Sequence, residues 1–331
     1  MTDIQETNAV TAEPGATKDA VSTAALGMGV KPLTPTKLAW RRFRRHKLAM
    51  ASAVILLVIV VMCTFAPLFT KYSWNTLIRN QSGGLERFLH PQHGHWLGTD
   101  ELGKDWYTNV LYGGRVSLEV GVMAALASTF VGTIIGVAAG YYGGWLDNLL
   151  MRITDLFLAI PLIVSLILLT GLPANEPWAR TLFGPSQSVR SVTTIIALFF
   201  WMPVARILRG LVLSLKEKEF VEAARAAGAS DRRIMFRHLM PNCTGQIIIN
   251  TTLSVAAAIL LEGALSYLGF GVDPVKTPTW GNLLAHAQGQ TQLLPALTFG
   301  PGIALVLTVL CVNFVGDGLR DALDPKQLSV S

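Results

Sequence analysis

Long apolar runs without a charged residue divide this chain into segments. Residues 48–69, 120–142 and 156–175 contain no Asp, Glu, Lys or Arg and consist mainly of aliphatic and small side chains. The hydrocarbon core of a bilayer is about 30 Å thick, and a helix needs roughly 20 apolar residues to cross it. Each of these three runs therefore predicts a transmembrane helix.

Three further runs complete the pattern. Residues 191–205 form a shorter run, and the two arginines that follow it, Arg206 and Arg209, can extend their charged ends to the membrane surface. Residues 245–270 and 296–315 form the fifth and sixth runs. We therefore predict an all-α integral membrane protein with six transmembrane helices.

The composition agrees with this fold class. Hydrophobic residues make up 51% of the chain and charged residues 15%, whereas a soluble domain carries about 25% charged residues. A water-soluble fold of this size is therefore excluded. The three cysteines, Cys63, Cys243 and Cys311, lie in or beside apolar runs without paired or ligand-like spacing, so we expect buried thiols and no disulfide framework.

The positive charges predict the orientation, because Lys and Arg collect in the cytoplasmic segments of membrane proteins. With the amino terminus inside, the inner segments hold eighteen Lys and Arg residues and the outer segments hold eight. We therefore expect both termini in the cytoplasm. The basic run at residues 41–47 then anchors the topology, so the net charge of +6 does not indicate nucleic-acid binding.

Three parts are expected along the chain. The first thirty residues are rich in Ala, Thr and Gly and poor in aromatic residues, so residues 1–36 are predicted to be a disordered cytoplasmic tail. A cleaved signal peptide is not expected, because the first apolar run begins late and is too long. Residues 37–116 should hold the first transmembrane helix and an extracytoplasmic loop, and residues 117–325 the rest of the membrane core.

The polar loop at residues 216–242 has a helical pattern of its own. Small apolar residues recur at helical spacing and form one face, which consists of Phe220, Ala223, Ala224 and Ala227. Gly228 is placed to end this helix in a left-handed conformation, Ser230 can cap a second short helix, and Pro241 marks the entry to the fifth span. The pattern fits a rigid contact with a partner protein, and it fits equally well an amphipathic segment on anionic lipid.

The same loop resembles the EAA loop of permeases of ATP-binding-cassette importers. The residues that carry the resemblance stand in the family's order, namely Glu222, Ala223, Ala224, Gly228, Ile234 and Pro241. The resemblance implies that this loop is the coupling helix that docks into an ATPase subunit. It also implies the type I importer permease fold, with residues 117–325 as the permease core.

Further motifs resemble the dipeptide and oligopeptide branch of this family, and the second permease of the pair in particular. They are HWLGTDELGKD with Gly98, Thr99 and Asp100, GGRVSLEVG, LDNLLMRITDLFLAIP, EGALSYLGFG, TPTWGNLL and FVGDGLRDALDPK. Two features depart from the pattern: Lys104 stands where arginine is usual, and the outer loop at residues 175–190 is long.

This resemblance implies a set of partners. They are a second homologous permease, two cytosolic ATPase subunits, an extracytoplasmic binding protein, membrane lipid and a peptide substrate, in a bacterial plasma membrane. A nickel or other small-solute importer is the alternative within the family. An ion-coupled secondary carrier is the alternative outside it, and would call for broken helices and several polar groups at the membrane midplane.

The sequence predicts no ATPase site or other catalytic site in this chain. It lacks the G-x-x-x-x-G-K-[ST] motif that cradles phosphates, so ATP and Mg²⁺ are expected only in the partner subunits. His90, His93 and His95 have a spacing that can bind a divalent metal. A solvated loop without metal is the preferred interpretation of these histidines.

Two features inside the spans are candidates for special roles. Gly132, Gly136, Gly140 and Gly144 fall four residues apart, a spacing that lets helices approach closely in lipid, either within the subunit or against the second permease. Glu262 lies within the fifth run, where an ionised carboxylate is costly, so it should face protein or water and have a partner. We expect it to have a structural or gating role, with substrate contact as the alternative.

Overall fold

The computed structural model describes residues 35–323. This part is built of helices joined by loops and contains no named strand. The helices are α2 (Pro35–Arg45), α3 (Lys47–Thr64), α4 (Ala66–Phe69), α5 (Trp106–Tyr142), α6 (Gly144–Leu158), α7 (Leu162–Asn175), α8 (Pro177–Phe183), α9 (Val189–Leu215), α10 (Glu219–Ala226), α11 (Asp231–Arg233), the π-helix η1 (Ile234–Leu239), α12 (Met240–Tyr267), α13 (Trp280–Ala287), the 3₁₀ helix η2 (Gln288–Gln290) and α14 (Pro295–Leu323). The tail predicted at residues 1–36 lies outside the described residues, except that its last two positions begin α2.

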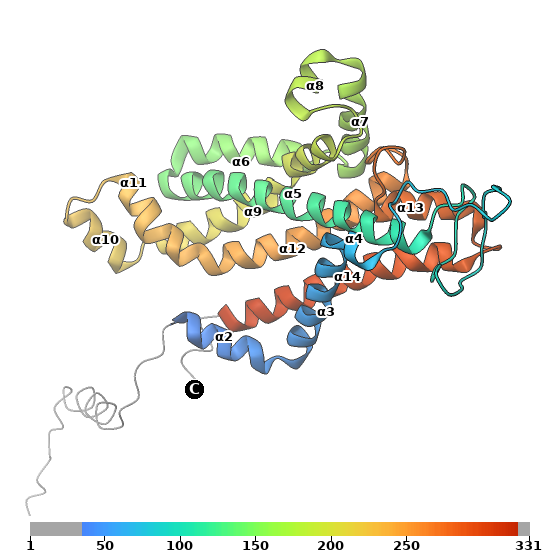
Figure 1. Cartoon of the computed structure of the whole chain (residues 1–331). Coiled ribbons are helices and arrows are strands. Elements are labelled where there is room, and N and C mark those ends of the chain that lie inside the picture. Colours follow the sequence, from blue (N-terminus) through green and yellow to red (C-terminus); the bar gives the residue numbers. More distant parts are fainter. Residues whose placement is uncertain (1–34, 324–331) are drawn as a thin grey trace, which may run out of the picture.

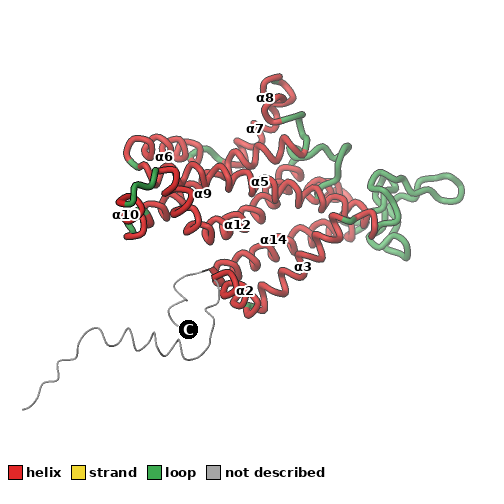
Figure 2. The backbone as a smooth tube through the Cα atoms, turned by 60° about the vertical axis from the view of Figure 1, so that its left-hand side comes forward, coloured by secondary structure: helices red, strands yellow, loops and turns green. Residues whose placement is uncertain are grey.

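The long helices run side by side, with α10 and α11 at one end of the bundle and α13 with the loop at residues 70–105 at the other (Figure 1). Five spans are long and apolar enough to cross a membrane: α3, α5, α9, α14, and the continuous helix formed by α11, η1 and α12. The bent pair α6 and α7 makes a sixth span if it is counted as one. Figure 2 shows most of the loop structure at the α13 end.

The second span begins earlier than predicted. The apolar run starts at residue 120, but α5 starts at Trp106 and has 37 residues, about 55 Å at 1.5 Å per residue. Arg115 and Glu119 end the charge-free run without ending the helix, because both side chains are exposed on its surface. The side chain of Asp105 caps the true start by accepting a hydrogen bond from Thr108 N.

The third span is not one straight helix, which corrects the prediction for residues 156–175. Helix α6 ends at Leu158, α7 begins at Leu162, and the two axes are bent by 89°. The break lies at Pro161, which caps α7. Proline lacks an N–H and disfavours helical backbone in the residue before it, so a helix cannot run through Ile160 and Pro161 without disruption.

The fifth span is longer than predicted, because Pro241 does not separate it from the loop. Residues 231–267 form one continuous helix in which six residues, Ile234–Leu239, have π-helical hydrogen bonds. The N–H of Met240 reaches back five residues to the carbonyl of Met235. This wider turn accommodates Pro241, so the helix continues from the loop into the fifth span without a break.

Helices α5 and α9 form the centre of the bundle. The predicted glycines lie at their interface. A Cβ added at Gly136 would lie 2.5 Å from the carbonyl oxygen of Ala205, and a Cβ added at Gly132 or Gly140 would lie 2.6 or 2.9 Å from a backbone oxygen of α9. These three glycines therefore pack within the subunit. Gly144 does not belong to the stripe, because it begins α6 with a φ of +57° and has open space around it.

Candidate functional site

The loop at residues 216–242 forms a short helix with a defined end. Helix α10 ends at Ala226, Ala227 is its C-cap, and Gly228 follows with a φ of +75°. The N–H of Gly228 donates to the carbonyl of Arg225, and the N–H of Ala229 donates to that of Ala224. This pair of bonds is the Schellman arrangement, which requires a left-handed residue and therefore favours glycine.

Helix α10 turns one face inward and leaves the other exposed. Val221 is fully buried and packs with Ile234, and Ala224 packs partly into the same cluster. Ala224 is half-buried and therefore lies at the border between the inner face and the exposed face. The exposed residues include two acids among apolar side chains, and they are Glu219, Phe220, Glu222, Ala223, Arg225, Ala226 and Ala227. Such a face allows close approach by another protein.

Side-chain contacts hold the loop against the membrane core on both sides of the Gly228 turn. The hydroxyl of Tyr141, at the end of α5, donates to the carboxylate of Asp231 at 2.6 Å. The guanidinium of Arg225 lies 5.6 Å from the centre of the same Tyr141 ring. Ser230 precedes α11 in an extended conformation, but its side chain makes no capping hydrogen bond. The loop therefore contacts α5 through side chains from both sides of the Gly228 turn.

Ion pairs connect α6 to α9 near the same end of the bundle. Arg209 forms a bidentate pair with Asp147, and Arg206 pairs with Asp155. Both arginines were predicted to extend their charged ends to the membrane surface, and in the structure each has an acidic partner there. Their acidic partners lie 62 and 51 positions away in the chain, so charge spacing along the sequence could not reveal them.

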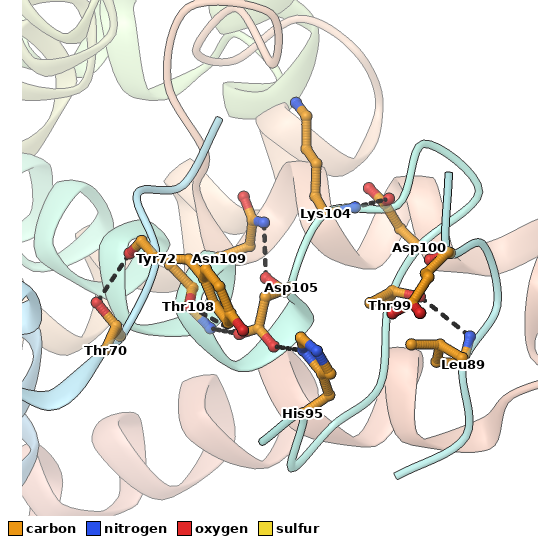
Figure 3. Close-up of polar contacts among 11 residues, drawn as sticks. Thr70, Tyr72, Leu89, His95, Thr99, Asp100, Lys104, Asp105, Thr108 and Asn109 are labelled. Carbon is orange, nitrogen blue, oxygen red and sulfur yellow. Dashed lines mark hydrogen bonds and ion pairs between the residues drawn. The ribbon is translucent and has the colours of Figure 1, made fainter. Parts of the chain in front are cut away.

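The predicted Gly98, Thr99 and Asp100 motif forms a tight loop at the α13 end. Gly98 has a φ of +79°, and a Cβ there would lie 2.1 Å from the carbonyl oxygen of Leu89. The hydroxyl of Thr99 donates to the carbonyl of Glu86 at 2.6 Å and accepts from the N–H of Leu89 at 3.0 Å. Figure 3 shows the Thr99 contact to Leu89 and the carboxylate of Asp100.

Asp100 holds the next turn of this loop. Its Oδ1 accepts from the N–H groups of Leu102 and Lys104 at 2.9 and 2.7 Å. The residue is only 3% exposed. Burial raises the pKa of the Asp100 carboxyl, although the two backbone bonds and nearby positive charge act in the opposite direction.

The three histidines of the outer loop do not converge. His95 is buried and its Nδ1 lies 2.8 Å from Oδ2 of Asp105, the residue that caps α5, whereas His90 and His93 are exposed (Figure 3). Among residues 35–323 no group of three or more His, Cys, Asp or Glu side chains has a geometry that could hold a metal ion. His95 instead positions the start of α5.

Glu262 lies at the centre of a buried hydrogen-bond network. Its carboxylate is fully buried and accepts from the hydroxyls of Ser117 and Ser266 at 2.8 and 2.7 Å. The Ser117 hydroxyl also accepts from the N–H of Trp280, and the Trp280 indole donates to the carbonyl of Val110 at 2.9 Å. Three separate motifs of the sequence thus meet here, and Glu262 joins α5, α12 and α13.

The bend between α6 and α7 has a consequence in a membrane. Residues 157–162 line a cavity of about 370 Å³ together with Phe199, Phe200 and Pro203. Because Pro203 has no N–H, the carbonyl of Phe199 lacks its usual helical partner. Irregular backbone at membrane depth is tolerated only where protein covers it or water fills a cavity beside it. At membrane depth, the backbone of this bend would therefore need cover from protein or water.

Sequence reasoning missed several residues that organise these two ends. Tyr141 and Asp231, and likewise Ser117 and Trp280, come from distant parts of the chain, and no local pattern pairs them. The tryptophan of TPTWGNLL is an exception. A fully buried tryptophan usually has a hydrogen-bond partner for its indole N–H, so a partner for this one could have been expected.

Comparison with known proteins identifies the family. Residues 132–329 match the family described as "Binding-protein-dependent transport system inner membrane component". Residues 34–91 match the "N-terminal TM domain of oligopeptide transport permease C". The first match alone covers more than half of the chain.

Individual relatives and a solved structure agree with this match. The dipeptide transport system permease protein DppC of Alkalihalophilus pseudofirmus is 36% identical over 90% of this chain and 92% of its own. The oligopeptide transport system permease protein OppC of Bacillus subtilis is 38% identical over 89% and 91%, and the glutathione transport system permease protein GsiD of Pectobacterium atrosepticum is 34% identical over 88% and 92%. An inward-facing structure of the MetNI methionine ABC transporter shares the fold with a TM-score of 0.54 and 18% identity, covering 65% of this chain and 96% of that one. The chain therefore belongs to the family of binding-protein-dependent transport system inner membrane components, and it has the fold of a type I ATP-binding-cassette importer permease.

Proposed function

We propose that this chain is one of two permease subunits of a bacterial plasma-membrane importer for dipeptides and oligopeptides. It pairs with a second homologous permease, two cytosolic ATPase subunits and an extracytoplasmic binding protein that delivers the peptide. ATP and Mg²⁺ bind the ATPase subunits, and this chain holds no catalytic site. The peptide substrate is supported by relatives named for dipeptide and oligopeptide transport over about nine-tenths of the chain.

One observation supports the coupling role most directly. Helix α10 exposes Glu222 and Ala223, and contacts within the chain hold this short helix in place. The turn at Gly228 ends the helix, and Tyr141 of α5 contacts the loop on both sides of that turn, through Arg225 of α10 and Asp231 of α11. A helix held in this way transmits a push from a docked ATPase to the membrane core. Closure of the two ATPases on ATP would bring the paired loops together and open the pathway outward.

The two alternatives differ in support. An ion-coupled carrier would be expected to have a broken helix, and α6 and α7 form one, but the family match assigns the chain to binding-protein-dependent systems. Nickel or another small solute remains the alternative within the family. The His90, His93 and His95 group offers it little support, because His95 is engaged with Asp105.

The proposed orientation places both termini and α10 in the cytoplasm. Ser230→Cys and Gln92→Cys, introduced singly, should react with a membrane-impermeant maleimide from opposite sides of the membrane. The native cysteines are buried, so the unsubstituted chain serves as the control. Labelling of both positions in intact cells would contradict this topology.

A deletion strain tests the substrate. Cells lacking this subunit, and auxotrophic for one amino acid, should fail to grow on a dipeptide or oligopeptide that supplies it, yet grow on the free amino acid. Growth should return when the chain is supplied from a plasmid. Normal peptide growth together with loss of nickel-dependent enzyme activity would favour the nickel importer instead.

A further inference from the structure

Helix α2 lies at the level where two of the apolar runs meet a polar end. Phe43 of α2 is buried against the carboxyl-terminal end of α14, in a small cluster with Ala49 and Ala322. This part of α14 comes after its apolar run, which ends at residue 315, and α3 begins at Lys47, directly before the run that starts at residue 48. Figures 1 and 2 show α2 beside this end of α14. Helix α2 is therefore placed at a membrane surface rather than inside the membrane.

One side of α2 carries exposed positive charge. Four basic residues stand at positions i, i+4, i+7 and i+8 and therefore share one helical face. They are Lys37, Arg41, Arg44 and Arg45, and all four are exposed. None of them forms an ion pair with an acid among residues 35–323. We call these four residues the basic stripe.

The other basic residues of this segment face the protein. Arg42 is half-buried. His46 accepts through Nδ1 from the N–H of Ala49 at 3.1 Å, and its Nε2 lies 3.8 Å from Oδ2 of Asp321 in α14. The run at residues 41–47 is thus divided in the structure. Part of it packs on α3 and α14, and part of it belongs to the exposed basic stripe.

Trp40 adds an aromatic ring beside the basic stripe. It is 59% exposed, and its ring stacks on that of Phe43 with the two centroids 6.0 Å apart. Tryptophan is enriched where a membrane meets water, because its amphipathic ring sits at the level of the lipid headgroups. An exposed tryptophan next to unpaired cations, on a helix at this level, indicates contact with headgroups.

We propose that the basic stripe and Trp40 bind the headgroups of anionic phospholipids. Each Lys or Arg near an anionic membrane surface strengthens association by about fivefold, so the four cations together provide a strong and salt-sensitive contact. The inference rests on the proposed orientation, which places α2 at the negatively charged cytoplasmic leaflet. It goes beyond that orientation, because the stripe stays exposed in the folded chain. Since α2 packs on α14, the bound lipid also holds the end of α14 at the surface.

An acidic surface of a partner protein is the alternative occupant. The level of α2 and the exposed ring of Trp40 favour lipid, because both place the stripe among headgroups. The two occupants also differ in how they read the cations. A protein carboxylate that pairs with a guanidinium in bidentate fashion discriminates against lysine, whereas a charged membrane surface responds to either cation.

Quenching by lipid tests the contact directly. Trp40→Cys, labelled with an environment-sensitive fluorophore, places a reporter at the ring position in a chain whose native cysteines are buried. The labelled chain is assembled with its partner subunits in nanodiscs of phosphatidylcholine, with or without phosphatidylglycerol, and doxyl-labelled phosphatidylcholine serves as the quencher. Quenching should increase with phosphatidylglycerol. It should fall by at least half at about 1 M salt, where the Debye length is about 3 Å.

Two triple variants identify the charges that are responsible. Replacing Arg41, Arg44 and Arg45 together by glutamine removes three charges from exposed positions and keeps a similar helix propensity. This variant should lose at least two-thirds of the quenching that phosphatidylglycerol adds. Replacing the same three arginines by lysine keeps the charge, and it should retain most of that quenching.

A matched control removes three charges elsewhere on the same chain. Arg232, Arg233 and Arg237 are exposed in the loop at residues 216–242, and replacing all three by glutamine lowers the net charge by the same amount. This variant should leave the quenching at position 40 unchanged. A loss of quenching equal to that of the α2 variant would show that net charge, and not the basic stripe, determines the contact, and would overturn the proposal.

Three further outcomes would also overturn it. They are equal quenching with and without phosphatidylglycerol, an unaltered glutamine variant of the stripe, and a lysine variant that behaves like the glutamine variant. The last of these would assign the stripe to a protein partner. Because a nanodisc presents the same lipids on both faces, this test does not depend on orientation. Quenching that follows phosphatidylglycerol would therefore stand even if the maleimide labelling reversed the proposed topology, and a correct topology without such quenching would refute the lipid contact alone.

Discussion

The contact between α5 and α9 offers the sharpest quantitative test of the fold. A methyl group added at Gly136 would lie 2.5 Å from the carbonyl oxygen of Ala205 and 3.0 Å from Cβ of Leu208. Ordinary contacts begin at 3.4 Å, so the helices would have to separate by about 0.9 Å at this point. The obstacle is helix backbone rather than the end of a flexible side chain, and overpacking of this kind costs about 1–3 kcal/mol.

A matched substitution isolates this cost. Gly210 lies on α9 itself, and a Cβ there would have no neighbour within 4 Å. Both Gly136→Ala and Gly210→Ala gain the same helix propensity, about 1 kcal/mol, so this gain cancels in the comparison. We expect Gly136→Ala to be less stable than Gly210→Ala by about 1–3 kcal/mol.

The assay is reversible unfolding of the purified chain in mixed detergent micelles, followed by tryptophan fluorescence, with both variants measured under the same conditions. If the two variants unfold at the same denaturant fraction, then the glycine stripe does not pack against α9. In that case the stripe would be free for the second permease, the alternative left open by its spacing alone.

Three further predictions concern coupling and rigidity. Glu262→Ala should destabilise the subunit by about 2 kcal/mol or more in the same unfolding assay, because the hydroxyls of its two serine partners lose their acceptor; an unchanged variant would contradict the network. Gly228→Val forces a β-branched residue to a φ of +75°, and Glu222→Lys inverts an exposed charge. Both variants should insert normally but lose transport and substrate-stimulated ATP hydrolysis. Wild-type uptake by either variant would exclude the loop from coupling. The double substitution Thr252→Cys and Gly316→Cys places two Cβ atoms about 3.7 Å apart, a distance suited to a disulfide. Oxidation to the disulfide should leave transport intact. Loss of transport on oxidation would show that α12 and α14 slide past each other.

Much of the membrane fold follows from the apolar runs, since a stretch of about 20 uncharged residues has few alternatives to a spanning helix. The exceptions have local physical causes. The break at Pro161 is invisible to a count of apolar residues, because proline interrupts backbone hydrogen bonding without adding charge. The start of α5 was placed too late for the opposite reason, because Arg115 adds charge without interrupting the helix.

The candidate sites were predictable only in part. The Gly228 turn was readable because its cause, a left-handed residue after a helix, lies within a few positions. A buried partner for Glu262 was expected from the cost of an intramembrane charge, but Ser117 lies 145 positions away. The cavity that Asp100 and His286 both line was not predictable at all, since these two residues lie far apart in the sequence.

Two long helices connect the loop at residues 216–242 with the Glu262 network. The helix from Asp231 to Tyr267 has 37 residues, about 55 Å of continuous helix, and it carries contacts with α10 at one end and Glu262 at the other. Helix α5 bridges the same two levels, since Tyr141 binds Asp231 near its carboxyl end and Ser117 binds Glu262 nearer its amino end. Two long helices joined at both levels resist sliding, because sliding would break the buried Ser117–Glu262 bond and the partly buried Tyr141–Asp231 bond. A push on α10 should therefore reach the Glu262 network as a rotation of the whole subunit.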